Sequence, residues 1–515
     1  MTGAPSPPSH PPAPRPLPPY LAAALVFGSS AAVLVLEITS LRLIAPYVGI
    51  TLETNTAVIG FALAAIALGA WTGGRVADSL DPRRLIGPLL LAGGALVLLI
   101  TPIVRFVAEA VGPSQAASVA LLLAAITVFA PAALLSAVPP MVVKLQLASL
   151  AETGSVVGRL SGISTLGAIV ATFVTGFVLV ALVPTSVILL GTGGLLALAG
   201  IALLVRSRGS GTSGSSTSAK RRTAGLLALV IVAAGLGVLA PQSCDTETRY
   251  HCARVENDPA RASGRLLILD TLRHSYVDLD DPTHLEFAYA RAVAAALDAH
   301  AAPGTPLSVL HIGGGGMTLP RYLLETRPGG TNEVVELDPG VVSVDRERLA
   351  LPDDEGLRVT VGDGRVGLAQ ARSDESDVVV GDAFGGVAVP WHLTTQEAVA
   401  DVSRALVPGG LYALNVIDHA PLDFARAEIA TIATIFEHLL VISPSGGLIG
   451  VPGGNIVVLA SDEEFDRTAI EAGLIDRATP MTIVSAAELD EFLGADPLVL
   501  TDDFAPVDQL LTPYG

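Results

Sequence analysis

The chain has 515 residues and a net charge of −19, and charged residues make up only 15% of it. Its mean hydropathy of +0.59 excludes a single soluble globule, and its length is sufficient for two or more domains. The acidic balance excludes the basic footprint of a nucleic-acid-binding protein, so no nucleic-acid partner is expected.

The composition changes sharply near residue 241. Residues 1–240 carry 13 Lys and Arg against 6 Asp and Glu, whereas the remainder carries 17 against 43. Apolar runs dominate the first part, and strand-like and helix-like segments alternate in the second. The sequence therefore predicts a disordered Pro-rich tail over 1–20, a helical transmembrane region over 21–240 and an α/β domain over 241–515. An acidic domain suits a small cationic ligand, although such a charge is more often simply a solvated surface.

Seven apolar runs follow the tail, and each is close to the ~20 residues that a helix needs to cross ~30 Å of hydrocarbon. Basic residues gather in every second connection, which places the N-terminus in the cytoplasm. Seven crossings then place the α/β domain outside the cytoplasm, and one miscounted helix reverses that placement. The runs cover about 21–45, 56–74, 85–104, 116–138, 161–183, 186–205 and 223–240.

The only two cysteines, Cys244 and Cys252, lie just after the last apolar run. In an oxidising compartment they would form a local disulfide, and otherwise they are two free thiols. The predicted outside placement favours the disulfide. The two cysteines and nine histidines show no metal-ligand spacing, so no metal site is expected.

The second part predicts a doubly wound, Rossmann-like α/β sheet. Residues 264–280 alternate apolar and polar residues and predict a small antiparallel ribbon ahead of that sheet. A repeating strand–helix pattern follows, typical of a mostly parallel sheet. We expect strands over 308–312, 333–337, 357–361, 377–380, 411–417 and 455–460, and helices over 283–297, from about 318, over 394–406 and over about 422–439.

Ligands of such sheets bind beyond the carboxyl ends of the strands. The run of Gly313, Gly314 and Gly315 follows the first strand and lets backbone amides approach a ligand closely. Glu336 lies 23 residues after Gly313, the spacing at which a carboxylate holds a ribose diol. Asp363 follows the third strand and is placed to accept a hydrogen bond from an adenine amine. These residues predict an adenosyl nucleoside site.

These motifs resemble those of spermidine synthases, the polyamine aminopropyltransferases. The resemblance covers about residues 265–440 and rests on His-Ile-Gly-Gly-Gly-Gly-Met from 311, Val-Val-Glu-Leu-Asp-Pro from 334, Val-Gly-Asp-Gly from 361 and Asp-Val-Val-Val-Gly-Asp from 377. It implies a spermidine synthase/methyltransferase-type domain that transfers an aminopropyl group from decarboxylated S-adenosylmethionine to putrescine, without a tightly bound cofactor. It also implies that Glu336 binds ribose, that Asp363 binds adenine, and that Asp382 lies at the catalytic strand end.

The whole chain resembles bacterial membrane proteins in which transporter-like helices precede a spermidine synthase-like domain. Residues 69–84 also resemble the basic loop between helices two and three of major-facilitator transporters. The resemblance implies a multi-pass protein of the bacterial plasma membrane, whose partners are the lipid bilayer and a small cationic amine or adenosyl nucleoside. Whether the chain forms a homo-oligomer is left open.

Several positions depart from the family. Gly316 and Gly385 stand where its members have the aspartates that contact the aminopropyl amine and activate the attacking amine, and His274 replaces a glutamine. The adenosine half of the site is therefore retained, whereas the half that handles amines is largely missing. Asp382 alone would then act as the base, or other carboxylates would replace the lost ones. The candidate replacements are Asp280, Asp281, Asp502 and Asp503. The alternative is that these four residues only form turns and helix caps.

Three functions fit these observations. The first is a membrane-anchored aminopropyltransferase. The second is a catalytically silent polyamine- or nucleoside-binding protein with a transport or sensing role, which the charged Glu37 inside the first apolar run also suits. The third is a methyltransferase that uses S-adenosylmethionine, because the fold is shared.

Overall fold

The structure is a computed structural model that describes residues 16–48, 52–111, 117–147, 152–209, 217–239, 244–384, 389–444 and 447–512. The chain divides into two compact units, one built mainly from residues before 243 and the other mainly from residues after it. The predicted tail lies almost wholly outside the described residues, as does the Gly385 position.

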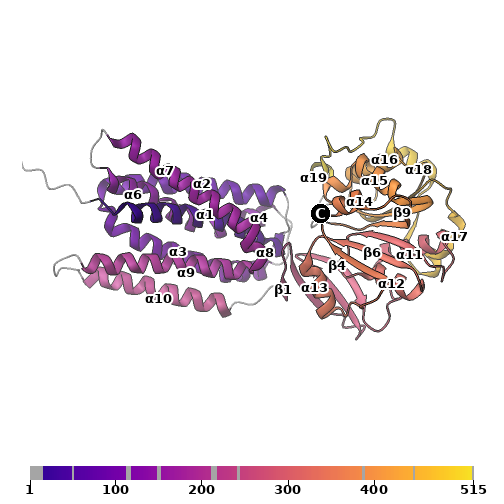
Figure 1. Ribbon diagram of the computed structural model, residues 1–515, viewed down its shortest axis with the longest axis horizontal. Helices are drawn as coiled ribbons and strands as arrows, with labels where there is room; N and C mark the ends of the chain where they lie inside the picture. The colour runs from indigo at the N-terminus through magenta and orange to yellow at the C-terminus, as the bar shows by residue number, and fades with distance from the viewer. Residues whose placement is uncertain are drawn as a thin grey trace, which may run out of the picture. The chain divides into compact units, whose positions relative to one another are not determined.

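The first unit is a bundle of apolar helices (Figure 1). Glycines permit close helix packing within it, because they lack the Cβ that would separate two backbones. A Cβ added to Gly69 of α2 would lie 2.2 Å from the carbonyl oxygen of Ala133, and one added to Gly94 of α3 would lie 2.7 Å from that of Gly193 in α9. The elements of this unit are α1 (Pro19–Val48), α2 (Leu52–Ser79), α3 (Pro82–Val111), α4 (Ala117–Ala124), η1 (Ala125–Phe129), α5 (Ala130–Ser136), α6 (Val138–Gln146), α7 (Thr153–Phe173), η3 (Val174–Leu179), α8 (Val180–Leu182), α9 (Thr185–Gly209) and α10 (Thr217–Leu239).

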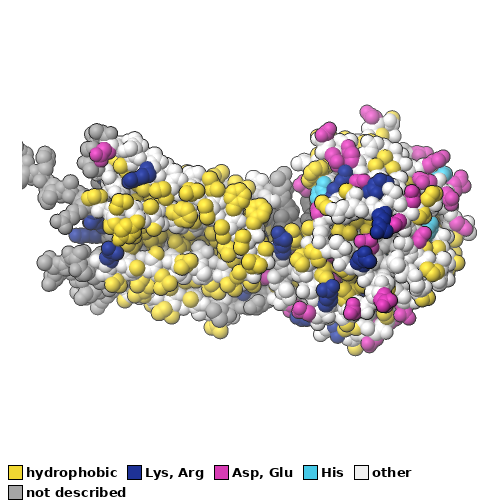
Figure 2. All heavy atoms as spheres, in the orientation of Figure 1, with side chains coloured by type: hydrophobic (Ala, Val, Ile, Leu, Met, Phe, Trp, Pro, Cys, Tyr) yellow, Lys and Arg dark blue, Asp and Glu magenta, His cyan; other side chains and the backbone are white. Residues whose placement is uncertain are grey.

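Six helical spans among the described residues are long and apolar enough to cross a membrane. This is one fewer than the seven expected from the sequence. The seventh expected run forms α10, in which the apolar stretch Ala224–Gly237 is shorter than the other spans. Hydrophobic side chains cover most of the visible surface of this unit in Figure 2, as expected for helices that face lipid.

The second unit contains two sheets. A four-stranded antiparallel sheet has the order β1-β2-β3-β4, and an eight-stranded sheet has the order β12-β10-β11-β9-β8-β5-β6-β7. Strands β5 to β9 are parallel, whereas β10, β11 and β12 pair antiparallel. The strands are β1 (Thr246–Glu247), β2 (Cys252–Asn257), β3 (Gly264–Leu269), β4 (Leu272–Asp278), β5 (Ser308–Ile312), β6 (Thr331–Glu336), β7 (Leu357–Val361), β8 (Ser376–Gly381), β9 (Leu406–His419), β10 (His438–Pro444), β11 (Gly453–Ser461) and β12 (Met481–Ile483).

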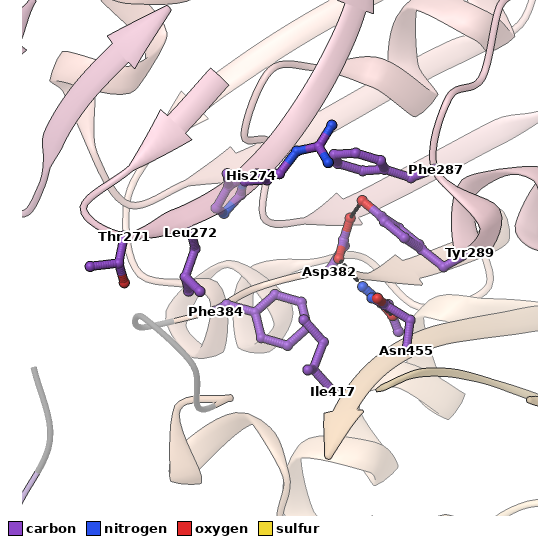
Figure 3. A pocket seen from close by; sticks show the side chains of 11 residues that line it. Thr271, Leu272, His274, Phe287, Tyr289, Asp382, Phe384, Ile417 and Asn455 are labelled. Atoms are coloured by element: carbon purple, nitrogen blue, oxygen red, sulfur yellow. Dashed lines mark hydrogen bonds between the residues drawn. The ribbon is translucent and has the colours of Figure 1, made fainter. Parts of the chain in front are cut away.

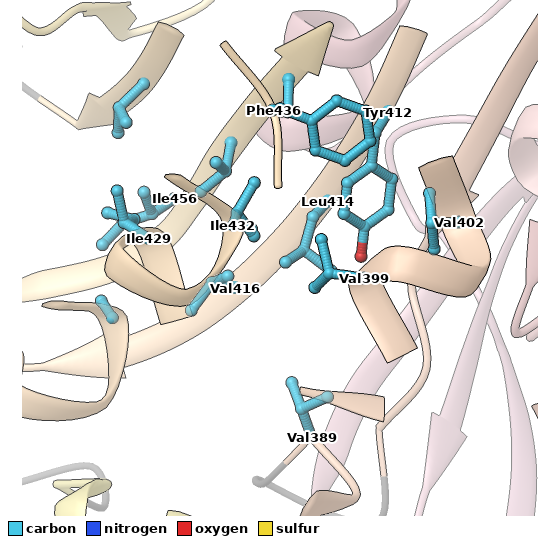
Figure 4. Packing of buried hydrophobic residues seen from close by; sticks show 14 of the residues in the cluster. Val389, Val399, Val402, Tyr412, Leu414, Val416, Ile429, Ile432, Phe436 and Ile456 are labelled. Carbon is cyan, nitrogen blue, oxygen red and sulfur yellow. The ribbon is translucent and has the colours of Figure 1, made fainter. Parts of the chain in front are cut away.

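Helices cover both faces of the large sheet, because alternate residues of each buried strand point to opposite faces. Leu310 and Val379 pack against α14, α15, α16 and α18, and Figure 4 shows part of this cluster. Val309 and Val378 pack against α11, α12 and α17 on the other face. The helices are α11 (Ala288–His300), α12 (Thr318–Thr326), α13 (Pro339–Arg348), α14 (Gly364–Gln370), η4 (Trp391–Leu393), α15 (Gln396–Ala405), α16 (Asp423–Ala433), α17 (Arg467–Asp476), α18 (Ala486–Leu493) and α19 (Val507–Leu510).

The predicted Rossmann-like fold is confirmed, with the correction that the sheet is mixed. The helix expected over 422–439 is wrong at its end, because α16 stops at Ala433 and β10 begins at His438. The expected ribbon has two additional strands, β1 and β2, and the Cys244–Cys252 disulfide joins the segment before β1 to β2. Strand β1 is only two residues long, which leaves too few residues for an alternating pattern to be recognised in the sequence.

Candidate functional site

The glycine run links the end of β5 to α12. Gly313 has φ +93° and Gly315 has φ +49°, values in the left-handed region that side chains disfavour. A Cβ added to Gly313 would lie 2.3 Å from the backbone carbonyl oxygen of Asp382. The run therefore lets the ends of β5 and β8 approach each other closely.

Glu336, the last residue of β6, lies against this loop. Its Oε2 accepts hydrogen bonds from the backbone N–H groups of Gly314 and Gly315 at 2.9 and 3.2 Å. Its Oε1 accepts one from the Asp338 N–H at 2.9 Å. A carboxylate has about four lone-pair sites, so acceptor capacity remains for a ligand hydroxyl. The predicted spacing thus places Glu336 beside Gly314 and Gly315.

Asp363 follows β7 and caps the N-terminus of α14. Its Oδ1 accepts hydrogen bonds from the backbone N–H groups of Arg365 and Val366 at 2.9 and 3.2 Å. Its Oδ2 lies 3.1 Å from the His392 Nε2. The helix cap uses Oδ1 of Asp363. Oδ2 of this half-exposed carboxylate keeps capacity to accept a further hydrogen bond.

Asp382 follows β8 and lies in a polar network that Figure 3 shows. Its Oδ2 accepts a hydrogen bond from the Tyr289 hydroxyl at 2.9 Å, and its Oδ1 accepts one from the Asn415 side chain at 2.9 Å. Asn455 in turn donates to the Asn415 Oδ1 at 3.0 Å. Burial raises the pKa of Asp382, although the Asn415 hydrogen bond, the His274 imidazole and the Tyr289 hydroxyl act in the opposite direction.

A cavity of about 310 Å³ opens beside Asp382. Its walls combine apolar and aromatic side chains with a few polar groups, which is the usual character of a small-molecule site. Burial lowers the pKa of His274, against the opposing field of the Asp382 and Glu336 carboxylates. The lining residues are Thr271, Leu272, Arg273, His274, Phe287, Tyr289, Asp382, Phe384, Asn415, Ile417 and Asn455.

Sequence reasoning gave no role to the partners of Asp382. Asn415 and Asn455 are polar residues in apolar stretches of β9 and β11, and that interruption is the signal that could have identified them. Tyr289 lies at the start of α11 and was given no role either. All three come from elements distant from Asp382 in the sequence, so their convergence depends on the tertiary fold.

Strand β4 fills the space beside Gly316, where the family carries a carboxylate. The Gly316 N–H donates to the Ser275 Oγ at 3.0 Å. A Cβ added to Gly316 would lie 2.9 Å from the Ser275 Cβ and 3.2 Å from the Val277 Cγ2. The local packing therefore leaves no room for an aspartate.

The proposed substitute carboxylates do not line the cavity. The Asp281 Oδ1 accepts from the Thr283 N–H at 3.1 Å and so forms a local turn. The Asp502 Oδ1 accepts from the Thr395 hydroxyl at 2.6 Å. The remaining two candidates, Asp280 and Asp503, have exposed side chains. Among the described residues, no group of His, Cys, Asp and Glu forms a metal site.

Parallel strands that end in a glycine loop and three acidic residues define a Rossmann-like fold. No protein-family model matches the chain. The chain is 28% identical over 224 residues to the polyamine aminopropyltransferase of Chromobacterium violaceum, a match covering 43% of this chain and 80% of that protein. It is 27% identical over 215 residues to the enzyme of the same name from Vibrio vulnificus, covering 40% and 70%.

Among solved structures, a probable spermidine synthase from Corynebacterium glutamicum is 30% identical, with a TM-score of 0.47. That match covers 52% of this chain and 98% of the other. The C-terminal half of the chain therefore has homologues among proteins named polyamine aminopropyltransferase. Among the described residues, six long apolar helices precede it.

Proposed function

We propose that this chain is a membrane-anchored aminopropyltransferase that acts on an amine bound beside Asp382. The observation that carries this proposal is the position of Asp382, in a small cavity at the carboxyl edge of the sheet and next to the glycine loop. The names of the homologues support the same reaction class. The donor in this proposal is decarboxylated S-adenosylmethionine.

The reaction needs a deprotonated amine held in line with an activated carbon. The amine nitrogen attacks the methylene carbon next to the sulfonium, the new C–N bond forms and the C–S bond breaks. The bonding electrons go to sulfur, and methylthioadenosine leaves. In this proposal Asp382 accepts the amine proton, and orientation within the cavity supplies much of the rate.

The adenosyl half of the ligand is assigned to the adjacent strand ends. The amides of Gly313, Gly314 and Gly315 approach the ligand, the Glu336 carboxylate accepts from the ribose hydroxyls, and the Asp363 Oδ2 accepts from the adenine amine. The support is that Glu336 and the glycine loop already contact each other. These roles match the carboxyl-edge position of ligands in sheets of this type.

The adenosyl assignment is tested by Glu336→Gln. Removing a charged acceptor from a hydrogen bond costs about 1.5–3 kcal/mol, so methylthioadenosine is expected to bind roughly 10- to 150-fold more weakly. Calorimetric titration of the full chain in detergent measures this. Glu333→Gln is the matched control, because Glu333 is an exposed carboxylate on the same strand. Equal affinities for both variants would show that the ribose site is misplaced.

A second candidate function is a catalytically silent binder of polyamines or nucleosides with a transport or sensing role. The specific observation in its favour is the packing of β4 where the family has a carboxylate, beside Gly316. Release of methylthioadenosine from the donor in the presence of amines separates the two candidates. No release with any amine, together with normal methylthioadenosine binding, would favour the silent binder.

The side of the membrane also separates the candidates. We propose a plasma-membrane location for the helical region, and the side that holds the α/β domain depends on whether α10 crosses. The Cys244–Cys252 disulfide supports an outside placement, because disulfides persist in oxidising compartments. A phosphatase fused to Gly515 reports the outside, and a fluorescent protein fused there reports the inside. Phosphatase activity would favour the silent binder, since the donor is cytoplasmic, and fluorescence would favour the transferase.

A further inference from the structure

The cavity beside Asp382 has a charge balance that does not suit a diamine. Of its lining residues, only Asp382 is acidic, and one, Arg273, is permanently cationic. Burial lowers the pKa of His274, and the other polar lining residues are amides and hydroxyls. Residues 385–388, which follow Phe384 in the chain, are Gly-Gly-Val-Ala and add no ionisable side chain. A diamine would bring two positive charges to a cavity with one carboxylate and one guanidinium.

The Arg273 guanidinium is available to a ligand. Arg273 lies on β4, its side chain is exposed, and its Cζ is 5.9 Å from the centroid of the Phe287 ring, which also lines the cavity. Both residues line the cavity, and a guanidinium over an aromatic face keeps its N–H edges free for other partners. No carboxylate in the described parts of the chain forms an ion pair with it. A guanidinium with open edges is the side chain best suited to bind a carboxylate in two parallel hydrogen bonds.

The remaining walls suit a short aliphatic chain between the two charges. Leu272, Phe287, Phe384 and Ile417 provide apolar surface, and Figure 3 shows Phe384 and Ile417 side by side near Asp382. The volume of about 310 Å³ lies at the small end of the roughly 300–1,000 Å³ range of ligand sites. The cavity therefore offers a carboxylate, an apolar wall and a guanidinium to a ligand of a few carbon atoms.

We propose that the acceptor is a small amino acid-like zwitterion, with its amine at Asp382 and its carboxylate at Arg273. This inference rests on the proposed transferase function and names its substrate class. The amine loses its proton to Asp382 and attacks the methylene carbon of the donor. The C–N bond forms, the C–S bond breaks with its electrons going to sulfur, and an N-aminopropyl amino acid and methylthioadenosine result. The carboxylate at Arg273 takes no part in the bond changes and orients the chain.

The test compares two ligands that differ in one terminal group. Putrescine and 4-aminobutyrate each carry an amine at one end of a four-carbon chain. At the other end 4-aminobutyrate has a carboxylate carbon where putrescine has an aminomethyl group. Both are titrated by calorimetry into the full chain in detergent, saturated with methylthioadenosine. We expect 4-aminobutyrate to bind at least about tenfold more tightly, the equivalent of one charge-assisted contact of about 1.4 kcal/mol.

Variants of Arg273 assign the preference to this side chain. Arg273→Gln should remove the preference for 4-aminobutyrate, and Arg273→Glu should reverse it toward putrescine. Arg254→Gln is the matched control, because Arg254 is exposed on β2 of the same small sheet and does not line the cavity. It should retain the wild-type preference. Methylthioadenosine affinity, measured in each sample, shows that a variant is folded.

Every other outcome overturns either the proposed acceptor class or the proposed transferase function. Putrescine binding as tightly as 4-aminobutyrate, no binding of either ligand, or an unchanged preference in Arg273→Gln overturns the acceptor class while methylthioadenosine still binds. Failure of the wild-type chain to bind methylthioadenosine overturns the transferase function and, with it, the acceptor class. The two failures are therefore distinguished within one set of titrations.

Discussion

Restoring the family aspartate at Gly316 should damage this protein instead of activating it. In Gly316→Asp, the new Cβ would lie 2.9 Å from the Ser275 Cβ and 3.2 Å from the Val277 Cγ2. Both neighbours belong to β4, which pairs with β3 and cannot move away cheaply. Overpacking of this kind costs about 1–3 kcal/mol, and loss of the Gly316–Ser275 hydrogen bond adds about 1 kcal/mol.

The sum of roughly 2–4 kcal/mol lowers the unfolding midpoint by roughly 4–16 °C for a domain of this size. Near-ultraviolet circular dichroism of the full chain in detergent follows the transition. Gly362→Ala is the control, because no heavy atom lies within 4 Å of a Cβ added at that position. The double variant with Ser275→Gly should recover part of the loss. A Gly316→Asp variant that matches the control in stability and gains transfer to putrescine would refute this reasoning.

Two further predictions concern pH. Burial lowers the pKa of His311 to about 4, below the ordinary value of 6.5, so its contribution to stability is present above about pH 6.5 and is lost as the pH falls toward 4. His311→Gln should remove up to about 3 kcal/mol of that acid destabilisation, and an unchanged dependence of the midpoint on pH would contradict this. Tyr289→Phe removes a donor to Asp382, so the pKa of Asp382 should rise further. The acidic limb of the transfer rate should then move to higher pH, and an unmoved limb in the pH–rate profile would count against Asp382 as the base.

The strand-end residues could be predicted because each belongs to a short local pattern. A buried strand followed by glycines, or by an acidic residue at a fixed spacing, places Gly313, Glu336 and Asp382 at one edge without any knowledge of the packing. The end of the helix expected over 422–439 could not be placed in the same way. The apolar residues on either side of His438 suit a helix and a buried strand equally, and only pairing of β10 with β11 decides between them.

The number of membrane-spanning helices also depends on more than the local pattern of the sequence. Hydropathy identifies apolar runs, and six of the seven became long apolar helices. The seventh, α10, has a shorter apolar stretch, and the side of the membrane that holds the α/β domain depends on whether this helix crosses. The phosphatase and fluorescent-protein fusions at Gly515 decide whether α10 crosses.

The sequence by itself determined the two-part organisation, the Rossmann-like class of the second part and the carboxylates at its strand ends, because hydrophobic periods and turn residues act over a few neighbouring positions. Only the tertiary structure decided what those carboxylates contact. It brought Tyr289 and Asn415 to Asp382, packed Ser275 against Gly316, and placed Arg273 at the rim of the same cavity. Contacts between residues far apart in the chain follow from the order and twist of the strands, which no local pattern encodes.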